Sequence, residues 1–292
     1  MTKRVTKAVL PIAGQGTRFL PATKSMPKEM LTLVDRPLIQ YAIDEARAAG
    51  ITEFIFITAR GKGALVDYFD RAPELENSLK AKNKTDLLEE LARTDIGSGS
   101  IATVRQQSAK GLGHAVWCAH RLIGDEPFAV ILPDDVIDAD VPVLKQMVDA
   151  HEQTGGCMVA AMEVSDQETC KYGIIDPGQA QGSAVQVRGM VEKPAAGTAP
   201  SNMAVIGRYI LTPEVLSALD AHEVGAGGEI QLTDAIAKQI STEAGVWGLK
   251  FDGQRYDCGA KLGYLQATVA YGLKHRELKD DFRTYLADLD LD

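Results

Sequence analysis

The chain has 292 residues, of which 45% are hydrophobic and 24% are charged, a balance that is ordinary for a globular protein with a sizeable core. Its 31 basic and 40 acidic residues give a formal net charge of −9, which argues against a general nucleic-acid-binding protein, because such domains are normally basic. A polyanionic ligand would therefore need a local cluster of cations or a bound divalent metal ion.

The four cysteines, Cys118, Cys157, Cys170 and Cys258, are widely spaced and form no CxxC pair. This spacing predicts neither a zinc site nor a disulfide framework, and it favours a reducing, cytoplasmic location. The basic start at residues 1–4 precedes only a brief apolar run, so the sequence predicts no signal peptide and no insertion into a membrane.

Residues 8–36 form the most informative stretch. Residues 8–13 are apolar and predict a buried strand, and two glycines in the run that begins at Gly14 allow tight backbone geometry and close approach of a ligand. Three cations follow on a segment stiffened by two prolines: Arg18, Lys24 and Lys28. A constrained cationic loop of this kind suits a phosphate ligand.

This stretch contains neither a GxGxxG fingerprint that opens directly into a helix nor a GxxxxGK[ST] loop. Instead, a helix is expected from Pro37 to Gly50, and a second strand at residues 54–59. The order strand, loop, helix, strand predicts a right-handed βαβ unit with the loop at the carboxyl end of the first strand, where open α/β sheets bind ligands.

The remaining elements predict one large α/β domain in which the second half turns antiparallel. Residues 70–95 are dense in charge and predict an exposed helical insertion, with a subunit contact as the alternative. Residues 110–114 form a second glycine turn and a second candidate ligand loop. The further expected strands are residues 101–105, 128–132, 157–164, 172–176, 184–191, 203–211 and 246–251. The further expected helices are residues 115–122, 142–153, 213 onward, 229–240 and 260–275, before an acidic, frayed tail.

The sequence gives little support to hydrolases and zinc proteases, because it has no GxSxG elbow and its histidines form no HExxH pattern. Asp134 and Asp257 each follow a predicted strand, and hard oxygen ligands suit Mg²⁺, which takes one or two protein carboxylates plus waters and substrate phosphates. The alternative is that both are turn or capping residues. Asp135 competes with Asp134, although strand alternation would point the two side chains in opposite directions.

Six motifs span nearly the whole chain in this order: AGQGTRFLPATKSMPKEML, RQQSAKGLGHA, ILPDD, YGIID, VEKP and YDCG. Together they closely resemble the bacterial UTP–glucose-1-phosphate uridylyltransferases, a branch of the sugar-nucleotide pyrophosphorylases, and they resemble the thymidylyltransferases less. The resemblance implies an α/β fold with a Rossmann-like, mixed, mostly parallel central sheet flanked by helices. It also implies a single domain over residues 1–292, with a nucleotide-binding half at about 1–140, a sugar-phosphate-binding half at about 141–260, and a C-terminal helix and tail at 260–292.

The resemblance also implies roles for individual residues. Arg18 and Lys28 would face the triphosphate, with Lys24 either beside them or merely solvated, and Asp134 and Asp257 would hold Mg²⁺ at the α-phosphate. The expected uracil-side residues are Ala13, Gly14, Gln106 and Gly111, with Gly16, Thr17 and Gly113 in the same glycine loops. A Gln amide can both donate and accept, which matches one face of uracil. The expected glycosyl-side residues are Gly173 and Glu192 at the sugar hydroxyls, Lys193 at the sugar phosphate and Val205 at the hexose.

The implied reaction is in-line attack by a phosphate oxygen of glucose 1-phosphate on the α-phosphorus of UTP, which gives UDP-glucose and pyrophosphate. It needs no general base, because a phosphate monoester is already mostly ionised at neutral pH. One alternative is a thymidylyltransferase or another sugar-1-phosphate nucleotidyltransferase. Another is a catalytically silent regulatory subunit, which should lack some of the four residues assigned to the triphosphate and the metal, yet all four are present. The resemblance further implies a homodimer or homotetramer and a role in polysaccharide biosynthesis. The net charge and the short N-terminal apolar run predict no nucleic-acid and no membrane partner.

Overall fold

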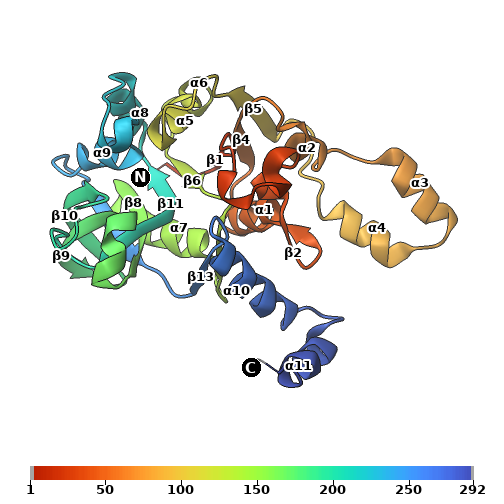
Figure 1. The fold of residues 1–292 in the computed structure, drawn as a ribbon. Helices are drawn as coiled ribbons and strands as arrows, with labels where there is room; N and C mark the ends of the chain where they lie inside the picture. Colours follow the sequence, from red (N-terminus) through yellow and green to blue (C-terminus); the bar gives the residue numbers. More distant parts are fainter. Residues whose placement is uncertain (1–2, 291–292) are drawn as a thin grey trace.

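The structure is a computed structural model and describes residues 3–290, so the first two residues of the predicted basic start and the last two of the predicted tail lie outside the described residues. A mixed β-sheet runs through the molecule (Figure 1). Its nine strands in the described part of the chain are β1 (Lys7–Pro11), β4 (Glu53–Thr58), β5 (Ile101–Arg105), β6 (Phe128–Ile131), β8 (Cys157–Glu163), β9 (Gly173–Gln181), β10 (Ala184–Glu192), β11 (Met203–Leu211) and β12 (Val246–Lys250).

The spatial order of these strands is β5-β4-β1-β6-β11-β8-β12-β10-β9. The first four are parallel, with Val9 of β1 opposite Ile55 of β4 on one side and Val130 of β6 on the other. From β11 onward most pairings are antiparallel, and β11 also pairs with β9 at Ala204, so the far part of the sheet curls. The predicted mixed, Rossmann-like sheet and its reversal in the second half are confirmed.

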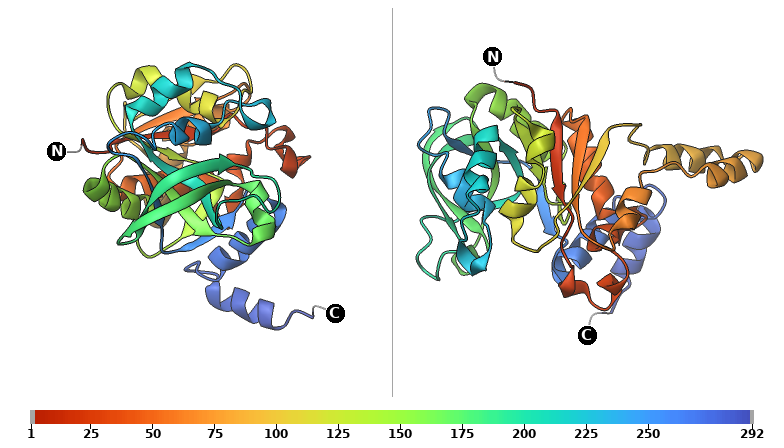
Figure 2. Two further views of the ribbon diagram at one scale, coloured as in Figure 1. Left: turned by 90° about the vertical axis from the view of Figure 1, so that its left-hand side faces the viewer. Right: turned by 90° about the horizontal axis from the view of Figure 1, so that it is seen from above.

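Helices lie along both faces of the sheet (Figure 2). They are α1 (Leu38–Ala48), α2 (Gly63–Asp67), α3 (Pro73–Ala81), α4 (Thr85–Ala92), α5 (Leu112–Trp117), α6 (His120–Ile123), α7 (Val143–Thr154), α8 (Pro213–Asp220), α9 (Leu232–Ala237), α10 (Lys261–Gly272) and α11 (Lys279–Ala287). Within residues 3–290, no helix is both long and apolar enough to span a bilayer.

Strand alternation divides the core between the two faces. Leu10 and Phe56 face the core that α1 and α7 cover, whereas Val9 and Ile55 face the core that α5, α8 and α9 cover. All four side chains are buried, which explains why the parallel strands read as continuous apolar runs rather than as alternating ones. The sheet is therefore held rigidly on both sides, and its strand ends provide a fixed platform.

The structure corrects several predicted boundaries. β9 does not end at Pro177 but continues to Gln181, because it is an edge strand whose pairing with β10 has irregular register around Val187, where a missing N–H is tolerated. The helix expected at residues 115–122 starts earlier and is broken into α5 and α6. The helix expected at residues 229–240 is limited to α9, because Glu229 and Gln231 have an extended backbone and the Ile230 carbonyl accepts from the N–H of Gly113 instead of from a helical N–H.

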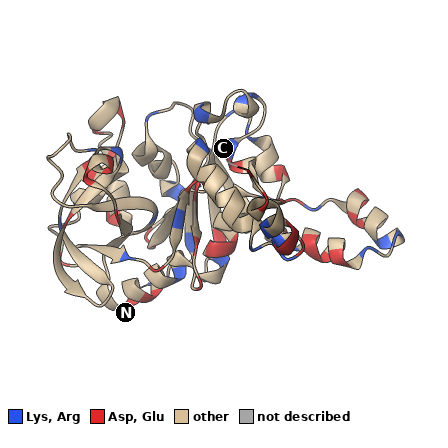
Figure 3. Ribbon diagram, turned by 60° about the horizontal axis from the view of Figure 1, so that its bottom comes forward, with Lys and Arg blue, Asp and Glu red and all other residues tan. Residues whose placement is uncertain are grey.

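Two segments project from the sheet (Figure 1). The pair α3–α4 carries acidic and basic residues along its length (Figure 3) and has no buried residue, so the predicted exposed helical insertion is confirmed. The tail that was expected to fray instead forms α11, whose Phe282 ring packs closely against Gly272 at the end of α10. The apolar Phe282 therefore gives the acidic tail a packing partner that its charge pattern did not suggest.

Candidate active site

Two cavities lie beyond the carboxyl ends of the parallel strands, where open α/β sheets are expected to bind ligands. The nucleotide-side cavity, of about 640 Å³, is lined by residues that follow β1, β4 and β5, among them Ala13, Gly14 and Gln106. The glycosyl-side cavity, of about 1080 Å³, is lined by Arg18, Asp134, Gly173, Glu192, Lys193, Val205 and Asp257. Most of the predicted site residues therefore lie around two adjoining spaces.

The loop after β1 is a series of short 3₁₀ turns, η1 (Thr17–Phe19), η2 (Ala22–Lys24) and η3 (Lys28–Met30). The Thr23 hydroxyl donates to the Gly16 carbonyl at 2.7 Å. Gly16 has φ +65°, and a Cβ there would lie 3.1 Å from the Cβ of Lys28. This close approach folds the loop back on itself, so that Arg18 and Lys28 reach the same region; Gly16 and Thr17 shape the loop and line neither cavity.

Asp134 and Asp257 converge through a small ribbon of β7 (Asp135–Asp138) and β13 (Gln254–Asp257), in which Asp135 pairs with Asp257. The N–H of Cys258 donates to the Asp134 carbonyl at 2.8 Å. A Cβ on Gly259 would lie 2.7 Å from Asp134 Oδ2 and 3.0 Å from Asp257 Oδ1. The two carboxylates thus face a common space that exists because residue 259 has no side chain.

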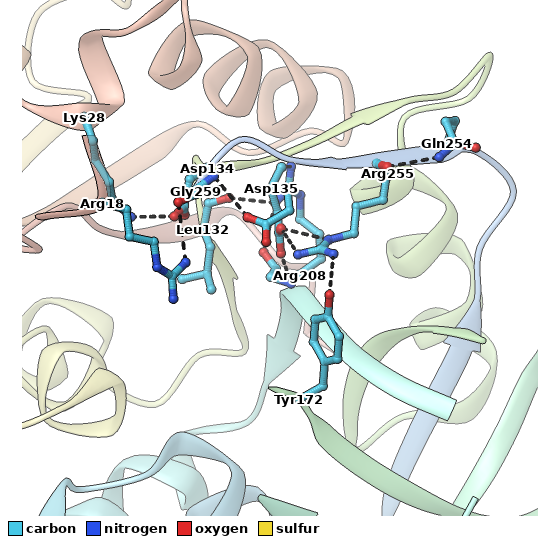
Figure 4. A network of polar contacts seen from close by, with 12 residues as sticks. Arg18, Lys28, Leu132, Asp134, Asp135, Tyr172, Arg208, Gln254, Arg255 and Gly259 are labelled. Carbon is cyan, nitrogen blue, oxygen red and sulfur yellow. Dashed lines mark hydrogen bonds and ion pairs between the residues drawn. The ribbon is translucent and has the colours of Figure 1, made fainter. Parts of the chain in front are cut away.

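Two cations lie beside Asp134 and Gly259 (Figure 4). Lys28 Nζ forms an ion pair and a hydrogen bond with Asp134 Oδ2, and Arg18 Nη1 donates to the Gly259 carbonyl at 3.4 Å. Burial alone would raise the pKa of Asp134, but the charge and hydrogen bond of Lys28 outweigh it and hold that pKa below its usual value. Asp134 is therefore ionised at neutral pH and paired with the predicted catalytic lysine.

No group of three or more His, Cys, Asp or Glu side chains in residues 3–290 is placed to hold a metal ion. Two converging carboxylates without nitrogen or sulfur donors still fit a hard divalent ion such as Mg²⁺, which completes its shell with waters and substrate phosphates. The space at Gly259 between Asp134 and Asp257 is therefore compatible with binding of a divalent ion by these two carboxylates.

Asp135 points away from Asp134, as strand alternation predicts, and joins a buried network (Figure 4). It accepts hydrogen bonds from Arg255 Nε and from the N–H of Gly207, both at 2.8 Å. Arg255 also donates to the Tyr172 hydroxyl at 3.1 Å. The network therefore ties the ILPDD segment to β11, to β13 and to the start of the glycosyl side.

Arg208 is the most buried cation of this network, with 1% of its surface exposed. It donates to both carboxylate oxygens of Glu45 on α1, at 2.9 and 2.8 Å, and to the carbonyls of Leu132 and Asp135. Sequence reasoning did not include Arg208, although an arginine inside the otherwise apolar run MAVIGRYIL was a usable signal, because a charge is buried only when it is paired.

On the base side, Gln106 Nε2 lies 3.1 Å from the Gly111 carbonyl and 3.0 Å from His114 Nδ1. Gly111 has φ +97° and packs against residues 229–230, and the N–H of Gly113 donates to the Ile230 carbonyl at 2.9 Å. Gly113 is buried and lines neither cavity, so the structure gives it a packing position rather than a ligand-facing one.

On the glycosyl side, Glu192 Oε2 accepts a hydrogen bond from the Thr233 hydroxyl at 2.7 Å, and Lys193 Nζ lies 3.2 Å from Glu192 Oε1. A Cβ on Gly173 would lie 3.1 Å from Glu192 Oε2, so a larger residue there would press on this carboxylate. Lys193 adopts φ +45°, which aims its side chain from a sharp turn at the end of β10. The sequence did not predict Thr233 as a site residue, because its hydrogen-bond partner Glu192 is 41 residues away in the chain.

The nucleotide-side cavity also holds cations that sequence reasoning did not assign. Arg60, Lys62 and Arg105 line it together with Lys24. Lys62 donates to Glu29 Oε2 at 2.8 Å in a buried pair directly beside Lys28. Arg60 and Lys62 follow β4 and Arg105 ends β5, at the same edge as the loop after β1, and these positions could have identified them from the sequence.

Comparison with known proteins agrees with this geometry. Residues 7–272 match the nucleotidyl transferase family. The chain is 50% identical to the UTP–glucose-1-phosphate uridylyltransferase of Bacillus subtilis, over 98% of both chains. It is also similar to a UTP-bound UGPase from Acinetobacter baumannii, at 42% identity and a TM-score of 0.89 over 98% of this chain and 100% of that one.

A second solved structure, a UDP-glucose pyrophosphorylase complexed with UDP-glucose, is 43% identical, with a TM-score of 0.82 over 93% of this chain and 100% of that one. The similarity thus extends over nearly the full length of each relative, and the family match over residues 7–272 includes every residue that lines the two cavities. The chain belongs to the nucleotidyl transferase family, in the group of the bacterial UTP–glucose-1-phosphate uridylyltransferases.

Proposed function

We propose that this protein transfers the uridylyl group of UTP to glucose 1-phosphate, giving UDP-glucose and pyrophosphate. The observation that carries the proposal is the ion pair of Lys28 with Asp134 and the hydrogen bond from Arg18 to the Gly259 carbonyl. Both lie where the carboxylates of Asp134 and Asp257 converge, beside a nucleotide-side and a glycosyl-side cavity. The relatives at about half identity are named for this reaction, and solved relatives hold UTP or UDP-glucose.

The roles of the site residues follow from their charges: the cations bind phosphates, and the carboxylates would bind the metal ion. The nucleophile is a phosphate oxygen that needs no deprotonation at neutral pH, so the main obstacle is repulsion between two anions. Arg18 and Lys28 offset that repulsion at the triphosphate, and Lys193 holds the sugar phosphate from the opposite side. Asp134 and Asp257 would hold Mg²⁺, which would supply further positive charge at the α-phosphate.

The base and the sugar are held by different elements. Ala13, Gly14, Gln106 and Gly111 meet the uracil, and the N–H groups of Gly14 and Gly111 make no hydrogen bond within residues 3–290, so they are free to donate to a base. On the other side, the residues that meet the hexose are Gly173, Glu192 and Val205, with the Glu192 carboxylate already oriented by Thr233.

The test is a pyrophosphate-release assay that offers UTP, dTTP, CTP and ATP against glucose, galactose and N-acetylglucosamine 1-phosphates. We expect the highest kcat/KM with UTP and glucose 1-phosphate, loss of turnover with EDTA and recovery with Mg²⁺. A preference for dTTP would favour the thymidylyltransferase alternative, and absence of turnover with every pair would favour a silent binding subunit.

We further propose that the chain works in the cytoplasm as a homodimer or homotetramer and supplies UDP-glucose for polysaccharide biosynthesis. Four unpaired thiols suit a reducing compartment. One sheet runs through both substrate halves, which supports a single domain rather than two. The exposed apolar side chains of α10, Leu262, Leu265 and Val269, support a contact between subunits.

A further inference from the structure

The amide of Gln106 has a fixed orientation. The atom 3.1 Å from the Gly111 carbonyl must be the amide nitrogen, because a carbonyl oxygen can only accept a hydrogen bond. The same nitrogen lies 3.0 Å from His114 Nδ1. Both amide hydrogens are thus used within the protein, and Oε1 has no hydrogen-bond partner in residues 3–290. Gln106 therefore offers a ligand only an acceptor, which is narrower than the donor-and-acceptor role expected from its sequence.

His114 provides half of this fixation. Its Nδ1 must accept from the Gln106 amide, so the ring is neutral and carries its hydrogen on Nε2. Burial, then the charge of Lys110 and the neighbouring His222, lower the pKa of His114 below the usual histidine value, which favours this neutral form at pH 7. The thiol of Cys118, 3.9 Å from the same nitrogen, is a longer and weaker contact.

The His114 ring itself is held in place. Its exposed fraction is 9%, and it lies in the first turn of α5 against the rings of Trp117 and His222, with centroid distances of 5.8 and 5.7 Å. Those two rings are 4.4 Å from each other, so they pack together on one side of His114. A buried ring that packs against two contacting aromatic rings keeps the direction of its Nδ1 lone pair. Because His114 Nδ1 accepts from Gln106 Nε2, the His114 ring also fixes the direction of Gln106 Oε1.

Gln106 Oε1, as a hydrogen-bond acceptor facing the base, distinguishes pyrimidines by the presence or absence of a hydrogen on N3. Uracil and thymine carry N3–H, which donates to an amide oxygen, whereas cytosine has an unprotonated N3 that would oppose it. We propose that His114 is a specificity-determining positioning residue that locks the Gln106 amide with its oxygen toward the base, so that the site accepts uracil or thymine and rejects cytosine. This inference rests on the proposed function, in which Gln106 meets the base.

The test compares kcat/KM for UTP, dTTP and CTP in the wild type and in His114→Phe, which keeps an aromatic ring but removes the acceptor. We expect the UTP/CTP ratio to fall roughly three- to tenfold, the value of about one hydrogen bond, through a higher KM for UTP. The UTP/dTTP ratio should not change, because both bases carry N3–H. His114→Asn, which restores an acceptor near Nδ1, should recover most of the discrimination.

His222→Phe is the matched control, because His222 touches the His114 ring but makes no hydrogen bond to Gln106. The proposal that His114 fixes the Gln106 amide would be overturned by an unchanged UTP/CTP ratio in His114→Phe, or by an equal fall of that ratio in His222→Phe. Should His114→Phe fail to fold, His114→Leu gives the same test. Gln106→Leu separates a failure of the proposed base site from a failure of the His114 proposal. If Gln106→Leu leaves the UTP/CTP ratio unchanged, the placement of the base is wrong. If the ratio falls in Gln106→Leu but not in His114→Phe, only the role of His114 is refuted.

Discussion

At the scale of single residues, the site depends on a side chain that is missing. Gly259 has no Cβ, and the carboxylates of Asp134 and Asp257 converge on the space that a Cβ would fill. The backbone at this position does not require glycine, because Gly259 is not among the residues with positive φ. The requirement for glycine is therefore one of space around the carboxylates and can be tested with the smallest possible addition.

We expect Gly259→Ala to fold normally and to lose roughly 100-fold or more in kcat, because its methyl group would force the two carboxylates apart. Divalent-ion affinity, measured by titration calorimetry, should fall in parallel. Gly189→Ala is the control, since the nearest atom to its added Cβ, in Asp176, is at an ordinary 3.6 Å. Wild-type metal affinity in Gly259→Ala would contradict the assignment of this space.

The two proposed phosphate-binding lysines should differ in their kinetic effects. Lys28→Ala should mainly lower kcat, by roughly 10²- to 10³-fold, because the side chain acts where charge changes during transfer. Lys193→Ala should mainly raise the KM for glucose 1-phosphate, roughly tenfold, since its half-exposed side chain contributes to ground-state binding. Lys238→Ala, whose partner Glu223 lies outside both cavities, is the control. Wild-type kinetics in both variants would remove them from the site.

At the scale of elements, Arg208 joins β11 to α1 through Glu45 inside the protein, with 1% and 9% of the two side chains exposed. Arg208→Met should lower the free energy of unfolding by about 3–5 kcal/mol, because Glu45 would remain buried without its partner. Arg188→Met breaks the exposed pair with Asp176 and should cost less than about 1 kcal/mol. Urea denaturation of both variants checks this, and equal losses would contradict it.

Elements whose burial is uniform were predictable from the sequence, and those fixed by distant contacts were not. The strand at residues 203–211 has its predicted bounds, because almost every position in it is buried. The late start of α9 was not predictable, since Ile230 pairs with Lys110 and Gly113, more than 100 residues earlier in the chain. The extension of β9 past Pro177 was not predictable either, since it depends on the irregular register of its hairpin with β10.

The same distinction applies to the candidate site. Asp134 and Asp257 were identified from their places after strands, and their convergence is as expected. The orientation of the Gln106 amide, the Thr233 hydroxyl on Glu192 and the Arg255 bond to Asp135 follow only from side-chain geometry between distant segments. Sequence patterns place a residue at a strand end, but they do not determine which atoms it presents.

At the scale of the whole molecule, two exposed surfaces are candidates for the contact between subunits of the proposed oligomer. The α10 surface carries Leu265 and Val269 on one helix face, with 60% and 38% exposed, and the α3–α4 insertion carries Leu75 and Leu87, with 50% and 54% exposed. The α10 side chains are four residues apart and form a continuous apolar stripe, whereas the insertion is mixed with charge (Figure 3).

We therefore expect Leu265→Glu/Val269→Glu to convert the proposed oligomer into a monomer of 31.4 kDa, as measured by light scattering after gel filtration. Leu75→Glu/Leu87→Glu, the matched double variant on the insertion, should keep the oligomer. The opposite pattern would assign the contact to the insertion, and a monomeric wild type would refute both.

The antiparallel pairing of β6 with β11 also sets an order for folding during synthesis. The last of the four parallel strands, β6, ends at Ile131, but the partner of its free edge comes at Arg208–Leu211, and the partner of the second glycine loop comes at Ile230. Until those residues leave the ribosome, Glu45 lacks its arginine and a buried strand edge stays open. The first half of the chain therefore cannot complete its sheet, and is prone to wrong pairing, until more than 60 further residues have been synthesised at roughly 5–20 residues per second.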